Sequence, residues 1–159
     1  MSSSKVNDNI VLFPTAYISI KALQECSLRI APKGSVIVGI VGQGKTRGLS
    51  SYLGIDTTIN QNMVAIVPNK ELKELNGRFL YLFFQRSYIS IRSLGRGANQ
   101  PALDTNLINN FPFVLPPFSE QIKITEFLNS QENKLTLAQQ KIEKAIALLK
   151  EYRTALITN

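Results

Sequence analysis

The sequence contains no histidine and a single cysteine, Cys26. Without imidazole, the chain cannot build a Ser-His-Asp triad, a Cys-His pair or a histidine-ligated zinc site. One thiol forms neither an internal disulfide nor a thiolate metal site, and it is typical of a reducing cytoplasm. We therefore expect no metal, no cofactor and no catalytic residue of the chain's own, because much hydrolytic and redox chemistry is excluded.

Long apolar runs are absent as well. The first residues, MSSSKVNDNIVLF, lack the apolar stretch and cleavage site of a signal peptide, and no run approaches the roughly 20 apolar residues of a membrane helix. The hydrophobic content of 44% still suffices for a core, so 159 residues correspond to one domain or to a small domain with an appendage. We expect a cytoplasmic protein that is not bound to a membrane.

Positive charge is concentrated in the middle of the chain. Residues 20–100 contain eleven Lys and Arg against four acidic residues, whereas residues 119–159 contain six against five. A basic body indicates a polyanionic partner, most often nucleic acid, although charge also serves simply to keep a surface solvated.

Local patterns predict an α+β fold with a mixed α/β body and one long C-terminal helix. Short β-rich runs, separated by Pro and Gly, predict strands near residues 11–13, 16–20, 35–41 and 62–68. The first ten residues are polar, and we expect them to be irregular. Residues 69–94 have the pattern of one helix, with its buried side chains between Phe79 and Phe84. Four prolines between residues 101 and 117 predict an extended connection, with a short edge strand at Val114–Leu115.

Residues 39–46 read GIVGQGKT and match the phosphate-binding pattern G-x-x-x-x-G-K-[ST]. A working P-loop needs a strand before it, a helix that begins at the Lys-Thr pair, and a carboxylate that holds magnesium. The strand is present, but residues 46–54 include two glycines and two serines, and no apolar run ends in an acid. A small P-loop phosphohydrolase is thus one interpretation. The other is a basic loop that brings Gln43, Lys45, Arg47 and Ser50 to a phosphate backbone or a base edge.

The C-terminal segment has the clearest helical pattern. Ser119 is a good N-cap, Glu120 follows it, and no Gly or Pro occurs afterwards. We expect a helix of roughly 38 residues, about 57 Å long, which exceeds the diameter of a body of about 120 residues. Its leucine-rich heptad predicts a coiled coil, although packing along its own domain is the alternative. The pairing residues would be Leu128, Leu135, Ala138, Ile142, Ala145, Leu149, Tyr152 and Leu156.

Two stretches, taken in order, resemble one protein family. The first combines YIS at 17–19, APKGSVIV at 31–38, the Gly-rich loop and TINQN at 58–62. The second combines GRGANQPAL at 95–103 with FVLPPFSEQ at 113–121 and the long helix. Over about residues 15–157, the chain resembles the DNA-specificity subunit of type I restriction–modification systems. That family has target-recognition domains joined by long spacer helices.

The resemblance implies two domains: a partial target-recognition domain, residues 1–115, and a spacer helix, residues 116–159. The loops around residues 42–52 and 92–100 would then face double-stranded DNA. For Arg92 and Arg96 the alternative role is to stabilise a helix C-terminus, and for Asn99 and Gln100 it is to hold the loop's own backbone. The candidate DNA contacts are Gln43, Lys45, Arg47, Ser50, Arg92, Arg96, Asn99 and Gln100.

The chain departs from the family in having one helix and one incomplete domain, where a full subunit has two of each. The resemblance therefore implies a half-subunit that forms a homodimer, or a truncated piece. Its other implied partners are methyltransferase (modification) subunits, which would use S-adenosylmethionine, and restriction subunits. We expect a non-catalytic DNA-recognition subunit; the alternatives are the P-loop phosphohydrolase and a coiled-coil interaction module.

Overall fold

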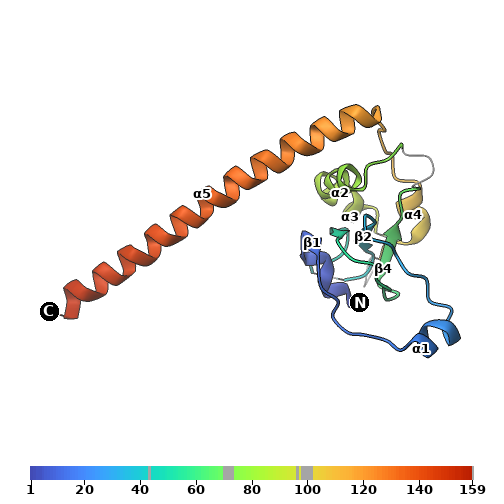
Figure 1. Ribbon diagram of the computed structural model, residues 1–159, viewed down its shortest axis with the longest axis horizontal. Coiled ribbons are helices and arrows are strands. Elements are labelled where there is room, and N and C mark those ends of the chain that lie inside the picture. The colour runs from blue at the N-terminus through green and yellow to red at the C-terminus, as the bar shows by residue number, and fades with distance from the viewer. Residues whose placement is uncertain (43, 70–73, 96, 98–101, 159) are drawn as a thin grey trace. The chain divides into compact units, whose positions relative to one another are not determined.

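The computed structural model describes residues 1–42, 44–69, 74–95, 97 and 102–158. It divides into two units, Met1–Ile122 and Lys123–Asn159. Unit 1 contains a small sheet with short helices, and unit 2 is a single helical segment (Figure 1). The boundary between the units lies inside the last helix.

A four-stranded sheet in the order β1-β3-β2-β4 forms the centre of unit 1. Its strands are β1 (Ile10–Val11), β2 (Val36–Gly39), β3 (Ser50–Leu53) and β4 (Met63–Ile66). Strand β2 pairs antiparallel with both β3 and β4, and β1 pairs parallel with β3. All four residues of β2 are buried, as expected for an apolar central strand that is covered on both faces.

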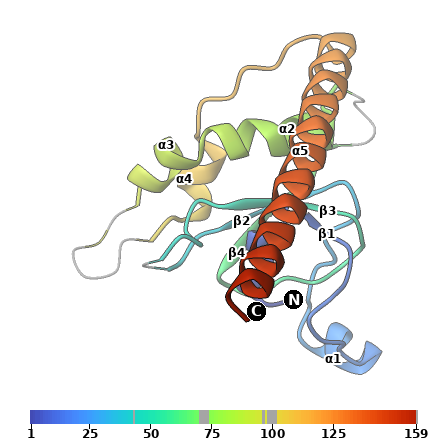
Figure 2. The same ribbon diagram turned by 90° about the vertical axis from the view of Figure 1, so that its left-hand side faces the viewer.

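Three helices cover one face of this sheet: α2 (Gly77–Arg86), α3 (Tyr88–Ser93) and α4 (Thr105–Asn109), as Figure 1 and Figure 2 show. Side chains alternate across a strand, so Val36 and Val38 point to this face and Ile37 to the other. The core on the helical side also contains Leu80, Tyr81, Phe84, Ile91 and Ile108.

The opposite face of the sheet is covered by the first residues of the chain. A 3₁₀-helix, η1 (Ser3–Asn7), buries Val6 against a cluster with Ile37 and Leu53. The Ser51 hydroxyl donates to the carbonyls of Lys5 and Asp8, which fixes this segment on β3. The expectation that the first ten residues are irregular is therefore wrong, because their few apolar side chains complete a core.

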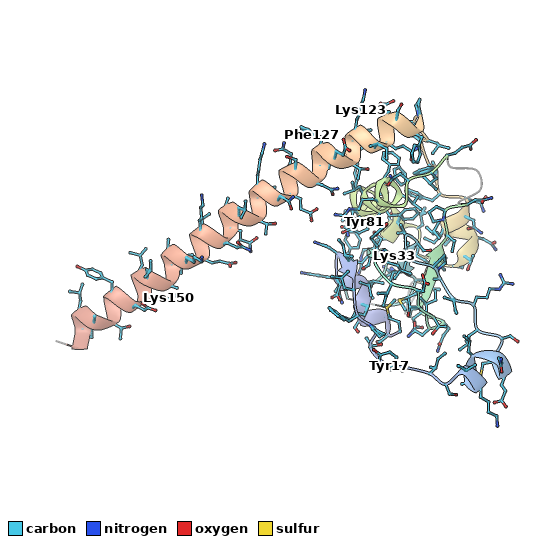
Figure 3. The ribbon with its side chains drawn as sticks, viewed as in Figure 1. Tyr17, Lys33, Tyr81, Lys123, Phe127 and Lys150 are labelled. Atoms are coloured by element: carbon cyan, nitrogen blue, oxygen red, sulfur yellow. The ribbon has the colours of Figure 1, made fainter. Side chains whose placement is uncertain are left out.

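Three further expectations about local structure are also wrong. Residues 16–20 do not form a strand: Tyr17 is 90% exposed (Figure 3), and α1 (Ile20–Glu25) begins where Ser19 caps it. The helix expected over residues 69–94 is two helices that meet at Ser87, and its residues 70–73 lie outside the described chain. Val114 and Leu115 are exposed and extended, with no strand assigned to either residue.

The last helix, α5 (Phe118–Thr158), has 41 residues, so it is about 62 Å long at 1.5 Å per residue. Ser119 lies within its first turn, so the expected role of Ser119 as N-cap is wrong. The α+β fold class with one long C-terminal helix is confirmed. Among the helices of the described chain, none combines the length and the hydropathy needed to cross a membrane.

Candidate nucleic-acid interface

The Gly-rich stretch is the connection between two antiparallel strands. Gly48 donates to the carbonyl of Gly39 at 2.8 Å, and Gly39 donates to that of Leu49 at 2.9 Å, so cross-strand bonds close the loop at its base. A P-loop instead leads from a strand into a helix, whose N-terminal amides hold the phosphates. Here β3 begins at Ser50, and residues 44–49 contain no helix. The structure therefore contradicts the P-loop interpretation.

The glycines of this hairpin loop permit close packing. A Cβ built on Gly39 would lie 2.5 Å from the carbonyl oxygen of Thr46, which no side chain tolerates. Gly48 has a φ of +85°, and a Cβ there would lie 3.3 Å from both Arg92 N and Tyr88 O. These two glycines let the loop fold back on itself and lie directly against α3.

We expect no specific ATP binding, only the weak attraction that any polyphosphate has for a basic loop. Isothermal titration with Mg²⁺-ATP should give no saturable binding at about 100 μM protein, and Lys45→Ala should not change the result. Saturable binding that Lys45→Ala abolishes would restore the phosphohydrolase interpretation. The physical reason is that the loop has no helix N-terminus at which a phosphate is held.

Helix α3 holds the hairpin loop through two hydrogen bonds to its main chain. The Tyr88 hydroxyl donates to the carbonyl of Lys45 at 3.0 Å, and Arg92 Nη1 donates to the carbonyl of Arg47 at 3.1 Å. Nothing in the sequence marked Tyr88 for this role, because a tyrosine in an apolar helix is usually part of a core. Together, α3 and the described part of the loop form one block, which we name the α3–hairpin block (residues 39–42, 44–49 and 88–95).

The predicted DNA contacts differ in their access to solvent. Lys45 is exposed at the loop, and Arg92 is half-buried beside it. Arg47 is only 8% exposed and Ser50 only 1%, so neither reaches the surface in this structure. The other four candidates, Gln43, Arg96, Asn99 and Gln100, lie outside the described residues.

The start of α5 is fastened to unit 1 by Gln121, which is fully buried. Its Oε1 accepts from the amide of Asn76 at 2.8 Å. Its Nε2 donates to the carbonyls of Glu74 and Pro116 at 2.7 and 2.8 Å. One amide side chain therefore joins the segment before α2 to the first turn of α5. The sequence analysis included Gln121 in a family motif but gave it no role.

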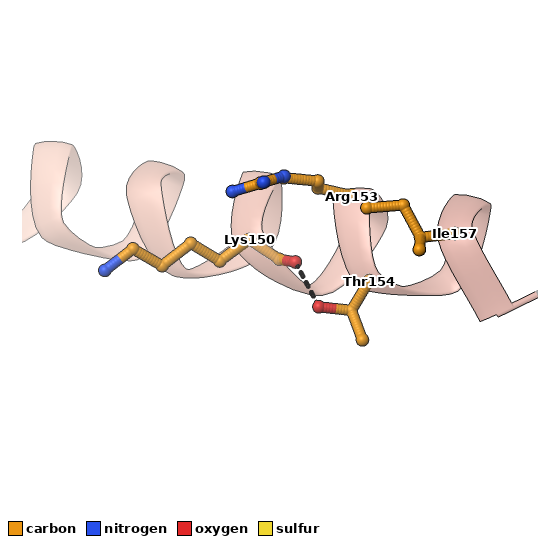
Figure 4. A pocket seen from close by; sticks show the side chains of 4 residues that line it. All are labelled: Lys150, Arg153, Thr154 and Ile157. Atoms are coloured by element: carbon orange, nitrogen blue, oxygen red, sulfur yellow. Dashed lines mark hydrogen bonds between the residues drawn. The ribbon is translucent and has the colours of Figure 1, made fainter.

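The pairing residues predicted on α5 are all exposed within the single chain. Leu135, Ile142 and Leu149 are 71%, 60% and 68% exposed. The other face of the helix carries ordinary polar contacts, such as Thr154 Oγ1 donating to the carbonyl of Lys150 at 2.9 Å (Figure 4). If a partner covered this apolar stripe, each Å² of apolar surface removed from water would contribute about 25 cal/mol of favourable free energy.

Residues 2–147 match the model of the family described as the type I restriction modification DNA specificity domain. The chain belongs to this family. The match takes in the α3–hairpin block, the Gln121 anchor and more than half of α5, and it confirms the resemblance drawn from the two sequence stretches.

A type I specificity domain recognises DNA and associates with the subunits of a restriction–modification complex. It is the specificity element of that complex and is distinct from the catalytic parts. In the described part of this specificity domain, no group of three or more His, Cys, Asp or Glu side chains is placed to hold a metal ion.

Proposed function

We propose that this specificity domain is the non-catalytic DNA-recognition subunit of a type I restriction–modification complex. Residues 1–115 would bind double-stranded DNA. Residues 116–159 would form a spacer helix that pairs with a second copy and docks methyltransferase subunits, with restriction subunits as further partners. Methyl transfer would then belong to the partner subunits. Family membership over residues 2–147 is the observation that carries this proposal.

The α3–hairpin block is the part of unit 1 that we assign to DNA contact. Its exposed Lys45 lies on a loop held by two hydrogen bonds from α3, so little backbone entropy is lost when a phosphate binds. In the sequence, Gln43 lies two residues before Lys45, and Arg96, Asn99 and Gln100 come after α3; all four lie outside the described residues and remain proposed contacts. Arg92 is half-buried and remains a proposed contact, whereas Arg47 and Ser50 are buried and would support the loop rather than contact DNA directly.

The apolar stripe of α5 supports the proposed pairing. Eight residues at heptad spacing are exposed, and burying them against the same stripe of a second copy would remove them from water. Antiparallel pairing would hold two recognition units a fixed distance apart, and that distance would follow from the length of α5. A two-part DNA site is the target that such an arrangement fits.

DNA affinity should fall steeply with salt. If each chain makes roughly three to five phosphate contacts, a pair of chains makes roughly six to ten, and the counterions released predict a loss of about 10³- to 10⁵-fold between about 50 and 200 mM salt. Fluorescence anisotropy with a duplex selected by the protein from a randomised pool measures this slope. An affinity that does not change with salt would remove the DNA-binding proposal.

Lys45→Ala should reduce the salt slope of the paired protein by about 1.8, the value of one phosphate contact from each of the two chains. The matched control is Lys21→Ala, because Lys21 is an exposed lysine of unit 1 whose nearest carboxylate is Glu25, at 3.7 Å on the same short helix. Equal losses in the two variants would mean that only net charge matters and that the block has no special role.

A further inference from the structure

Arg47 lies below the surface of a strongly basic protein, where arginine is seldom found. The residue as a whole is 8% exposed, although a guanidinium normally stays in water while its stem packs. A Cβ built on Gly95 would lie 3.2 Å from Arg47 Nε and 3.4 Å from Cζ. The guanidinium is therefore packed directly against the backbone that follows α3.

The main chain of Arg47 also contacts α3. Its carbonyl accepts from Arg92 Nη1 at 3.1 Å, and the next residue, Gly48, lies against the backbone of Tyr88 and Arg92. Arg47 thus contacts α3 through its carbonyl, and Gly95, two residues after the helix ends, through its side chain. This double contact joins the hairpin loop to the C-terminal end of α3.

We propose that Arg47 is a positioning residue that fixes the hairpin loop against the C-terminal end of α3, so that the α3–hairpin block meets DNA as one surface. The link to DNA rests on the proposed function, whereas the fixing of the hairpin loop does not. Sequence discrimination requires several side chains to reach base edges together, but attraction to phosphate requires only charge nearby. Arg47 should therefore govern discrimination and leave the salt-dependent part of the affinity unchanged.

Arg47→Met keeps an unbranched apolar stem and removes the guanidinium. In this variant, we expect the preference for the selected duplex over a scrambled one to fall by about fivefold, the low end of what one bidentate base contact contributes. The salt slope should equal that of the parent. Lys45→Ala is the matched neighbour and should behave in the opposite way, with a lower slope and unchanged discrimination. A slope that falls by about 1.8 in Arg47→Met would show a direct phosphate contact in each chain and overturn the proposal.

Hydrogen exchange of the free full-length protein tests the same proposal without DNA. The reporter amides are those of Gly48, Leu49 and Gly95, which donate to Gly39, Thr46 and Arg92. They should exchange about tenfold faster in Arg47→Met, while amides of β2 and β4 keep the parent rate. Parent rates at all three reporters would overturn the proposal, even if DNA binding is intact.

Gly95→Ala provides a milder second variant in case Arg47→Met does not fold. The added methyl group meets the guanidinium at 3.2 Å, so the side chain must shift by a few tenths of an ångström. The same reporters should exchange faster, by a smaller factor. A parent protein that fails to bind DNA would remove the proposed function, and the exchange result would still decide the role of Arg47.

Discussion

Replacing Gln121 by leucine should lower the free energy of unfolding of unit 1 by about 3–5 kcal/mol. The side chain is fully buried and makes three hydrogen bonds, to the amide of Asn76 and to the carbonyls of Glu74 and Pro116. Leucine preserves most of the volume but leaves those three backbone groups without their partner. Each buried group left unpaired costs about 1–3 kcal/mol.

The loss should extend to the start of α2. Asn76 caps α2 through its Oδ1, which accepts from the amides of Arg78 and Phe79 at 2.9 and 3.0 Å. Gln121 accepts from the amide of this same capping residue, so the start of α2 and the start of α5 are coupled. Gln121→Glu should be at least as damaging, because a carboxylate would face two carbonyl oxygens without a proton to donate.

Urea unfolding followed by tyrosine fluorescence measures this effect. The chain has no tryptophan, and four of its five tyrosines lie in unit 1, so the signal reports that unit rather than α5. Gln140→Leu is the matched control, because it makes the same exchange at an exposed position of α5 and should change stability by less than about 0.5 kcal/mol. Similar midpoints for the two variants would mean that the Gln121 anchor contributes nothing.

The double variant Ile142→Glu, Leu149→Glu should abolish pairing through α5. Burial of one such side chain contributes about 1.5–3 kcal/mol, and a symmetric dimer loses it in both chains. Two positions in two chains therefore raise the dissociation constant by more than about 10³-fold, before any repulsion between the new carboxylates is counted.

Sedimentation equilibrium over a range of concentrations tests the pairing. The control is Asn133→Glu, Gln140→Glu, which adds the same charge at the same seven-residue spacing on another face of α5. The control should associate as the parent does. A parent that stays monomeric at about 100 μM would contradict self-pairing and leave the stripe to a different partner.

The parts of the fold that could be predicted are those specified by local sequence. Short apolar runs predict the strands β2 and β4, and the seven-residue repeat of apolar residues predicts the helix α5. The residues YISI at 17–20 show how that logic fails. Their composition favours a strand, yet a strand also needs a neighbour to pair with, and here Ser19 caps a short helix instead.

The candidate site shows a different limit. Charge and loop position selected Lys45, Arg47 and Ser50 together, but only Lys45 reaches the surface. The difference arises from the packing of α3 on the hairpin, which joins residues more than 40 positions apart. Sequence patterns alone contain no information about that contact. The burial of Gln121 was hidden for the same reason, since its partners at residues 74 and 76 come from a distant segment.

The tip of the hairpin offers room for change. A Cβ built on Gly44 would have no described heavy atom within 4 Å, in contrast to the crowded Gly39 and Gly48 on either side. A side chain added at this position would therefore extend into open space, while the packing at Gly39 and Gly48 beneath it stays as it is. The loop can thus present a different side chain without disturbing the contacts on which its shape depends.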